Sequence, residues 1–368
     1  MPRRWVVFAF ATVLFSVMPA VPASAAGPTH VTSHISTNTT WTRTGEPYIV
    51  DIPTLWVQPG VTLTIQPGVK VVMSQSLGVI EVKGNLQAIG TKTRKIVFTG
   101  GPNYFSGSTA KGQWRYIGFE NAGTGRLDYV DIKYGGFVHN DFAPWADSVL
   151  RMNSSLDVWV TNSMIHDNNN SGVLATANVP IHISSTEIYR NDIGVAVVGA
   201  TNGVVEIDHS SIRNNSTGLY INHSDVPVLQ SFITQSNITG NDRGVQLNEP
   251  LTPAARYPTG DLNNIWNNNG GIDQLQVNNP RLTDEHLWEP NYWGDYFVGS
   301  LCPWALTTWQ WHVAPIEVFP TTDPGPIQST VWIKVNNDGS ASGCRTDDLP
   351  IGDWSNDVYG WTIPGPFP

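Results

Sequence analysis

A short pattern recurs along the middle of this chain at nearly constant intervals. The segments "SMIHDNNNSGVLA", "TEIYRNDIGVAV", "SSIRNNSTGLYI" and "SNITGNDRGVQL" align on an isoleucine, and each isoleucine is followed by a glycine. Ile165, Ile188, Ile212 and Ile238 are separated by 23, 24 and 26 residues, and further copies align on Ile132 and Ile265. A repeat of this length is typical of a chain that stacks one supersecondary unit upon another.

Each repeat contains several short apolar segments separated by polar turns. A second apolar residue lies five positions before the isoleucine, and Ser, Thr, Asn and Asp fill the space between them. No helical periodicity is present, and the LxxLxL ladder of a leucine-rich repeat is absent. The pattern predicts an all-β parallel β-helix with about 24 residues in each coil. We expect stacked amide ladders from turn asparagines such as Asn191, and positive φ angles at glycines such as Gly194.

The first coils resemble a known superfold. The stretch "LWVQPGVTLTIQPGVKVVMSQSLGVIEVKGNLQAIGTKTRKIVFTG" is similar to the entry coils of secreted right-handed parallel β-helix proteins of the pectate-lyase-like superfold. The later coils resemble NosD-like carbohydrate-binding and sugar-hydrolase repeats, and "NYWG" (291–294) is similar to a motif that closes such helices. The resemblance covers about residues 50–295. It implies the fold but not one function, because this superfold includes lyases, hydrolases, epimerases and adhesins.

The N-terminus has the pattern of a secretory leader. Arg3 and Arg4 precede the apolar run "WVVFAFATVLFSV", and the small residues Ala23-Ser24-Ala25 follow. We expect a signal peptide at residues 1–25 and a secreted protein, since the apolar run is too short to span a membrane. The alternative is a retained anchor. The predicted domains are then the leader, a β-helix over residues 26–295 and a C-terminal region over residues 296–368.

The charge of the chain limits its partners. Without the leader, 18 basic residues face 30 acidic ones, which gives a formal charge of −12. Such a chain repels phosphate backbones, and it has no basic amphipathic segment for a membrane surface. We therefore expect neither nucleic acid nor, after leader cleavage, a membrane as partner, and we expect a monomer. The negative charge also favours a neutral polysaccharide over a polyanionic one.

The C-terminal region differs in composition from the repeats. Residues 285–368 contain eight of the fifteen tryptophans. Because a solenoid needs its open end covered, we expect a tryptophan-rich cap. The alternative is a sugar-stacking surface at Trp309 and Trp311, which lie two residues apart. Cys302 and Cys344 are the only cysteines, and in an exported protein they predict one disulfide, worth about 4 kcal/mol in the chain-entropy model.

Titratable residues flank the repeated isoleucines. Because side chains alternate along a strand, these neighbours face outward and form columns with a spacing of about 4.8 Å between coils. The residues after the isoleucines include Lys133, His166, Tyr189 and Arg213. A lyase needs a base and a cation for the uronate carboxylate, and His166, Tyr189 and Arg213 meet that need, with Lys133 beside them.

Two pairs of carboxylates suit a hydrolase instead. Asp131 and Glu187 lie two coils apart on one column, roughly 9.6 Å by the coil spacing, and Glu206 and Asp208 lie two residues apart, roughly 6.6 Å. Inverting glycosidases hold their carboxylates about 6.5–9.5 Å apart. His182 lies one coil from Glu206 on the same outward column. The alternative for both columns is a solvated face with no chemical role.

One coil is longer than its neighbours. The step from Ile132 to Ile165 is 33 residues, and the excess falls in "GGFVHNDFAPWADS" (135–148), which contains His139, Asp141 and Trp145. Insertions become loops, and loops beside a groove often bind substrate. The alternative is a surface excursion that packs back onto the coils.

These observations favour a secreted β-helix that binds and cleaves an extracellular polysaccharide, with glycoside hydrolase chemistry ahead of a uronate lyase. The alternative is a non-enzymatic surface or adhesive solenoid. The sequence has no GxSxG, HExxH, phosphate loop or calcium repeat, so we expect no cofactor, although calcium is possible and copper is a more distant alternative.

Overall fold

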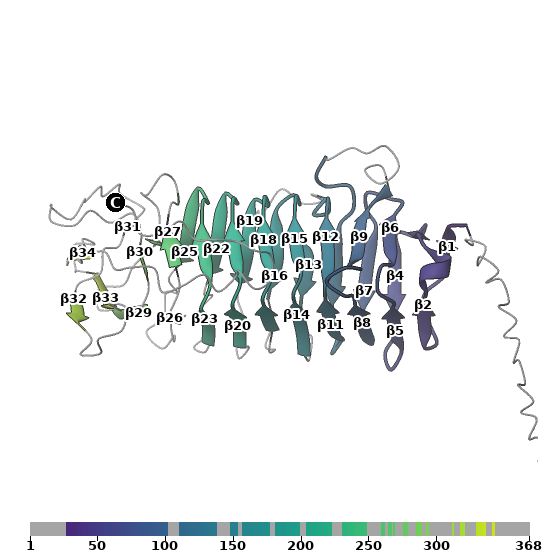
Figure 1. The fold of residues 1–368 in the computed structure, drawn as a ribbon, viewed down its shortest axis with the longest axis horizontal. Coiled ribbons are helices and arrows are strands. Elements are labelled where there is room, and N and C mark those ends of the chain that lie inside the picture. The colour runs from purple at the N-terminus through teal and green to yellow at the C-terminus, as the bar shows by residue number, and fades with distance from the viewer. Residues whose placement is uncertain are drawn as a thin grey trace, which may run out of the picture.

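The chain forms a long stack of short strands. The computed structural model describes residues 27–101, 110–137, 148–153, 157–176, 181–198, 204–222 and 230–248, and beyond them Asn268 and the backbone of the short strands named below. Each coil contributes one strand to each of three sheets, and the sheets run along the length of the molecule (Figure 1). The sequence prediction of an all-β parallel β-helix is confirmed.

We name the three sheets A, B and C. Sheet A contains β1 (Thr29–Val31), β3 (Tyr48–Val50), β6 (Lys70–Met73), β9 (Ile96–Gly100), β12 (Val130–Lys133), β15 (Met164–His166), β18 (Glu187–Tyr189), β21 (Ser211–Arg213), β24 (Asn237–Thr239), β27 (Asn264–Trp266) and β30 (Tyr292–Trp293). Sheet B contains β4 (Thr54–Val57), β7 (Val79–Val82), β10 (Tyr116–Phe119), β13 (Ser148–Met152), β16 (Ser171–Ala175), β19 (Ile193–Val198), β22 (Thr217–Asn222), β25 (Arg243–Asn248), β28 (Leu275–Asn278) and β31 (Trp311–His312). Sheet C contains β2 (Thr39–Trp41), β5 (Thr62–Ile65), β8 (Asn85–Ile89), β11 (Thr124–Asp128), β14 (Asp157–Thr161), β17 (Ile181–Ser184), β20 (Val204–Asp208), β23 (Gln230–Thr234) and β26 (Thr259–Asp261).

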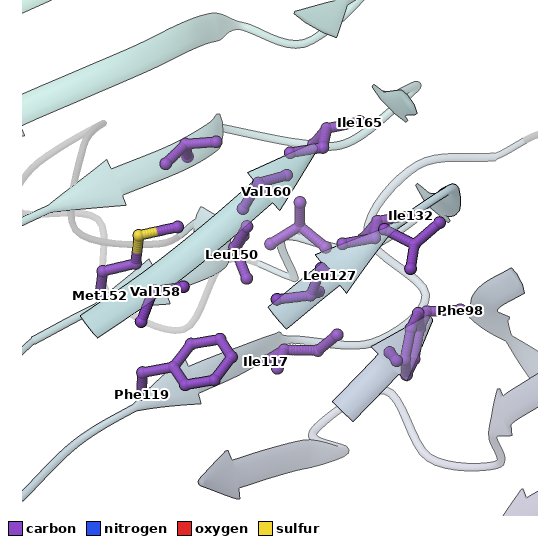
Figure 2. Close-up of a cluster of buried hydrophobic side chains, with 14 of the residues drawn as sticks. Phe98, Ile117, Phe119, Leu127, Ile132, Leu150, Met152, Val158, Val160 and Ile165 are labelled. Atoms are coloured by element: carbon purple, nitrogen blue, oxygen red, sulfur yellow. The ribbon is translucent and has the colours of Figure 1, made fainter. Parts of the chain in front are cut away.

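The repeated isoleucines pair with one another in sheet A and form one continuous core ladder. Ile132, Ile165, Ile188, Ile212 and Ile238 are aligned on successive strands, and all five are fully buried. The apolar residues five positions earlier, from Val160 to Ile233, form a second buried ladder in sheet C. Figure 2 shows side chains from several strands meeting inside the coils, with Phe98 and Phe119 among them. The core therefore extends along the axis of the solenoid.

The chain turns at two left-handed residues in each coil. One lies three positions before the isoleucine and one lies two positions after it; around Ile188 these are Ser185, with φ of 51°, and Arg190, with φ of 54°. Ten residues occupy this conformation in five successive coils: Tyr129, Tyr134, Asn162, Asp167, Ser185, Arg190, His209, Asn214, Gln235 and Gly240. Only one of them is a glycine, so the bends do not depend on glycine.

The repeated glycines have another purpose than the one we predicted. Gly172, Gly194 and Gly218 lie within β16, β19 and β22 and have no positive φ. A Cβ on Gly194 would lie 2.5 Å from the backbone oxygen of Gly218 and 2.7 Å from Cγ2 of Ile212. The expectation of a glycine turn at Gly194 was therefore wrong, and the glycine is needed because the next coil packs against it.

Two buried ladders of polar side chains connect the coils at the bends. Asn168, Asn191, Asn215, Asn241 and Asn268 are stacked between sheets A and B, and the Oδ1 atom of Asn215 accepts hydrogen bonds from N (2.9 Å) and Nδ2 (3.2 Å) of Asn191. The asparagine ladder was predicted and is confirmed. A second ladder, formed by Ser163, Thr186, Ser210 and Ser236 between sheets C and A, was not predicted. In both ladders the side chains satisfy buried backbone groups that a bend would otherwise leave unpaired.

The described backbone near the C-terminus changes from parallel to antiparallel pairing. β31 pairs antiparallel with β28, and a separate four-stranded antiparallel sheet contains β29 (Glu285–Trp288), β33 (Ser329–Val335), β32 (Glu317–Pro320) and β34 (Ala341–Ser342). The predicted leader, Trp309, and the predicted Cys302–Cys344 disulfide lie outside the described residues, as does the side chain of Trp311. The tryptophan-rich cap and the domain boundary at residue 295 stay predictions.

Candidate functional site

The outer face of sheet A holds most of the titratable residues that the sequence placed beside the isoleucines. Asp131, Met164, Glu187 and Ser211 are aligned on successive strands, and so are Lys133, His166, Tyr189 and Arg213. The predicted register is confirmed. We call Asp131, Lys133, His166, Asp167, Glu187, Tyr189, Arg190 and Arg213 the sheet A network.

His166 is the centre of this network. Its Nε2 lies 2.9 Å from Oδ1 of Asp131, and its Nδ1 lies 2.6 Å from Oδ2 of Asp167. Lys133 donates to the other oxygen of Asp131 at 2.6 Å, and Arg190 binds both oxygens of Asp167 at 2.6 Å each. The imidazole is buried and bridges two carboxylates, each of which also has a cationic partner.

Tyr189 connects this half of the network to a second ion pair. Its ring stacks on His166 with centroids 4.7 Å apart, and the guanidinium carbons of Arg213 and Arg190 lie 4.2 Å and 4.6 Å from its centroid. Arg213 donates to Glu187 at 2.6 Å, and Glu187 is almost fully buried. The phenol ring is thus held by one imidazole and two guanidinium groups.

The pKa values follow from this packing. Burial alone would raise the pKa of Asp131, but the hydrogen bond from His166 and the charge of Lys133 outweigh burial and hold it below its usual value. Burial would lower the pKa of His166, but its two carboxylate partners outweigh burial and raise it. Burial raises the pKa of Tyr189 to about 12. Asp131 is therefore held ionised, while His166 and Tyr189 hold their protons more tightly than usual.

This arrangement is poorly suited to the lyase and hydrolase chemistry considered for these residues. A general base must have a free acceptor, whereas both ring nitrogens of His166 contact carboxylates and its pKa is raised. A general acid needs a raised pKa, whereas that of Asp131 is lowered. Arg213 is already bound to Glu187. The network resembles a structural ion-pair network more than a poised active site.

The outer face of sheet C presents a different cluster. Arg126, Trp159, His182 and Glu206 are aligned on β11, β14, β17 and β20. The rings of Trp159 and His182 stack with centroids 3.9 Å apart and planes inclined by 15°. Nδ1 of His182 lies 2.6 Å from Oε2 of Glu206, and its Nε2 lies 3.8 Å from Oδ1 of Asp157. We call Asp157, Trp159, His182 and Glu206 the Trp159 cluster.

This cluster is open to solvent. Trp159 is 42% exposed. His182 covers one face of the indole, so the opposite face is directed toward the strand that holds Arg126. Asp208 lies two residues after Glu206 on β20 and contacts His209 at 2.8 Å. Alternation along β20 puts Glu206 and Asp208 on the same outward face, as predicted, about 6.6 Å apart by the strand rise.

The two faces differ in which partner of each ion pair reaches solvent. Where a Lys or Arg pairs with a carboxylate on sheet A, the cation is the more exposed partner: the side chain of Arg190 is 52% exposed and that of Asp167 19%. The same order holds for Lys133 over Asp131 and for Arg213 over Glu187. His166 is the deeper partner in its own two contacts. On sheet C the carboxylate is the more exposed partner, since Glu206 is 48% exposed and His182 17%. Sheet A therefore presents cations to solvent, and sheet C presents carboxylates.

Sequence reasoning missed several residues of these clusters. Trp159 lies one coil before His182 on the column already identified, so extending that column by one coil would have found it. Asp167 and Arg190 occupy the left-handed position two residues after the isoleucine. This position lies outside the strand, so alternation does not predict where their side chains point. Their bidentate contact could not be predicted from the repeat.

Other expected features lie outside the described residues. His139, Asp141 and Trp145 belong to the long coil and are among the residues that the structure does not describe. Within the described residues, no group of three or more His, Cys, Asp or Glu side chains is arranged to hold a metal ion. The described part of the chain also contains no helix with the length and apolar character needed to cross a membrane.

Comparison with known proteins agrees with the architecture. Residues 96–276 match the family model of the right handed beta helix region. No curated protein and no solved structure gives a significant match. Together with the three parallel sheets, the family match identifies the fold of this chain as a right-handed parallel β-helix.

Proposed function

We propose that this β-helix binds an extracellular polysaccharide on the outer face of sheet C. A right-handed β-helix is consistent with a carbohydrate-active or a surface protein. The observation that carries the proposal is the exposed indole of Trp159, held in place by His182 and surrounded by solvent-facing carboxylates. A sugar ring would pack on the part of the indole that His182 leaves uncovered while its hydroxyl groups donate to the nearby carboxylates.

We further propose that the bound glycan is neutral and that Glu206 and Asp208 hydrolyse it. Asp128, Asp157, Glu206 and Asp208 face outward on this sheet and Arg126 is the cation among them, so a uronate polymer would be repelled. The Cα atoms of Glu206 and Asp208 are about 6.6 Å apart by the strand rise, and carboxyl groups held near that separation suit an inverting mechanism. A uronate lyase is less favoured, because the groups that it would use are engaged in the sheet A network. Export is part of this proposal and is supported by the leader-like residues 1–25.

A panel of neutral and uronate polysaccharides tests the reaction. The mature protein is incubated with each polymer while reducing ends and the absorbance of unsaturated products are followed. We expect new reducing ends from a neutral polymer without unsaturated products, and we expect Glu206→Gln with Asp208→Asn to abolish them while binding persists. Both signals together would indicate a lyase. Binding without products would indicate an adhesive solenoid.

The binding face is tested with a matched pair of tryptophan variants. Trp56 on sheet B is 38% exposed and also stacks on a histidine, His34, at 4.4 Å, so it is similar to Trp159 in exposure and in its histidine partner. It differs in that Lys83 Nζ also lies 4.6 Å from its ring centroid. Trp159→Ala should weaken binding of the preferred neutral polymer roughly tenfold, as the loss of a central aromatic contact does. Trp56→Ala should change it less than about twofold. Equal losses in the two variants would remove sheet C from the proposal.

A further inference from the structure

The outer face of sheet A gathers cations in a chain that is acidic overall. Lys70, Lys95, Lys133, Arg190 and Arg213 lie on this face or at its edge, and they are five of the 20 Lys and Arg residues of a chain with 30 Asp and Glu. His166 adds to them, because its two carboxylate partners favour its charged form. The carboxylates on the same face or at its edge are Asp51, Asp131, Asp167 and Glu187. The cations therefore outnumber the carboxylates on sheet A.

Burial makes the excess of positive charge larger at the surface that a ligand would contact. In the ion pairs of Lys133, Arg190 and Arg213 the carboxylate is the deeper partner, and Glu187 is almost fully buried. Lys70 is exposed at one end of the face, and half of the Arg190 side chain is exposed toward the other. A buried, paired carboxylate repels an approaching anion weakly, whereas an exposed cation attracts it.

The cations are also spaced along the axis. Lys70 is on β6 and Arg213 on β21, which are separated by five coil spacings of about 4.8 Å, or roughly 24 Å. Lys133 on β12 lies between them, and Arg190 follows β18. A row of this length suits a linear polymer with repeated negative charges better than it suits a single small anion.

We propose that the outer face of sheet A is a second binding surface, which holds an anionic polysaccharide through its carboxylate or sulfate groups. This surface is separate from the Trp159 cluster on sheet C and does not depend on the function proposed there. It requires no reaction, since the basic groups that a lyase would need are occupied. The solenoid would then hold a charged glycan on one face and a neutral glycan on another.

Polymers with the same backbone and different charge test this surface. Binding is measured with dextran and dextran sulfate, and with polygalacturonate and its methyl ester, at about 50 and 300 mM salt. We expect dextran sulfate, polygalacturonate or both to bind tightly at low salt and at least about tenfold more weakly at high salt, with no binding of the uncharged forms. The two charged polymers distinguish sulfate from carboxylate recognition. Tighter binding of an oligonucleotide than of either charged glycan would overturn the assignment to a polysaccharide.

Matched charge variants locate the surface. Lys70→Gln with Arg190→Gln should weaken the charged polymer about fivefold or more and reduce the salt dependence. Loss of the Arg190–Asp167 contact could unfold the double variant, so Lys70→Gln is also measured alone. This single variant should still weaken binding about twofold. Arg126→Gln removes an exposed cation from sheet C and should leave binding unchanged. Equal effects of Arg126→Gln and Lys70→Gln, or equal binding of dextran and dextran sulfate, would overturn the proposal.

Discussion

Sheets A and C are formed by strands of the same coils, with the same spacing and a shared core, yet their outer faces are organised in opposite ways. On sheet A, His166, Tyr189 and the ion pairs around them contact one another, and their carboxylates are buried. On sheet C, Trp159 and Glu206 are exposed and contact only one or two described side chains each. The carboxylates of sheet A thus stabilise the coils, whereas those of sheet C are exposed to a ligand, although both alternate with the same core ladder.

We expect the greatest loss of stability from a substitution in the asparagine ladder, which supports both faces. Asn215→Ala would remove the acceptor of the buried N–H of Asn191 and a donor to the carbonyl of Ile188. Unsatisfied buried groups cost about 1–3 kcal/mol each, so we expect a loss of about 3 kcal/mol in the free energy of unfolding. Denaturant unfolding measures it. A loss below about 0.5 kcal/mol would mean that the ladder contributes little.

A matched pair of isosteric substitutions compares the two faces directly. Glu187→Gln on sheet A removes the charge that neutralises the largely buried Arg213, and we expect a loss of about 2 kcal/mol. Glu206→Gln on sheet C weakens a pair whose carboxylate is half exposed, and we expect less than about 0.5 kcal/mol. Equal losses, measured by the same unfolding assay, would contradict the division into a stabilising face and an open one.

The sheet A network should also make the stability of the protein depend on pH. Because the pKa of His166 is raised in the folded state, its contribution is complete below its unfolded pKa of about 6.5 and is lost as the pH rises through the folded value. Because the pKa values of Asp131 and Asp167 are lowered, their contributions exist above the unfolded value of about 4 and are lost as the pH falls through the folded values. The network should therefore stabilise most strongly between these limits.

His166→Gln tests this pH dependence. We expect the wild-type protein to lose stability as the pH rises above the unfolded histidine value of about 6.5, and the variant to lose less, because it has no imidazolium to deprotonate. At about pH 6 the variant should be roughly 2 kcal/mol less stable, since hydrogen bonds to two carboxylates are weakened. The same alkaline loss in both proteins would assign it to another group.

The repeat predicted most of the scaffold because its spacing is set by the backbone. Stacking coils in register requires the isoleucines to align, so a period of about 24 residues gives the core ladder and the outward columns together. The reason for the glycines was not predictable from the sequence. A side chain at Gly194 would clash with the neighbouring coil, whereas the φ of Gly194 itself does not require glycine. The serine and threonine ladder was hidden for a similar reason: Ser210 and its relatives are common turn residues whether or not they are buried.

The candidate site was only partly predictable from the sequence. Alternation gives the face on which Glu187, His166 and Glu206 lie, and the structure has all three on the expected outer faces. Alternation does not give burial, which depends on whether long neighbours such as Arg213 fold over a carboxylate. Because that difference decides whether a titratable residue is part of the scaffold or is exposed to a ligand, the two faces looked alike in the sequence.

Hydrogen–deuterium exchange of the whole protein, with and without the neutral polysaccharide that binds most tightly in the panel, locates the face on which that polymer binds. We predict that the polymer slows exchange in β14, β17 and β20 of sheet C, around Trp159, His182 and Glu206, and leaves β12, β15 and β18 of sheet A unchanged. Slower exchange in the sheet A strands, with no change in the sheet C strands, would contradict binding of the neutral polysaccharide on sheet C.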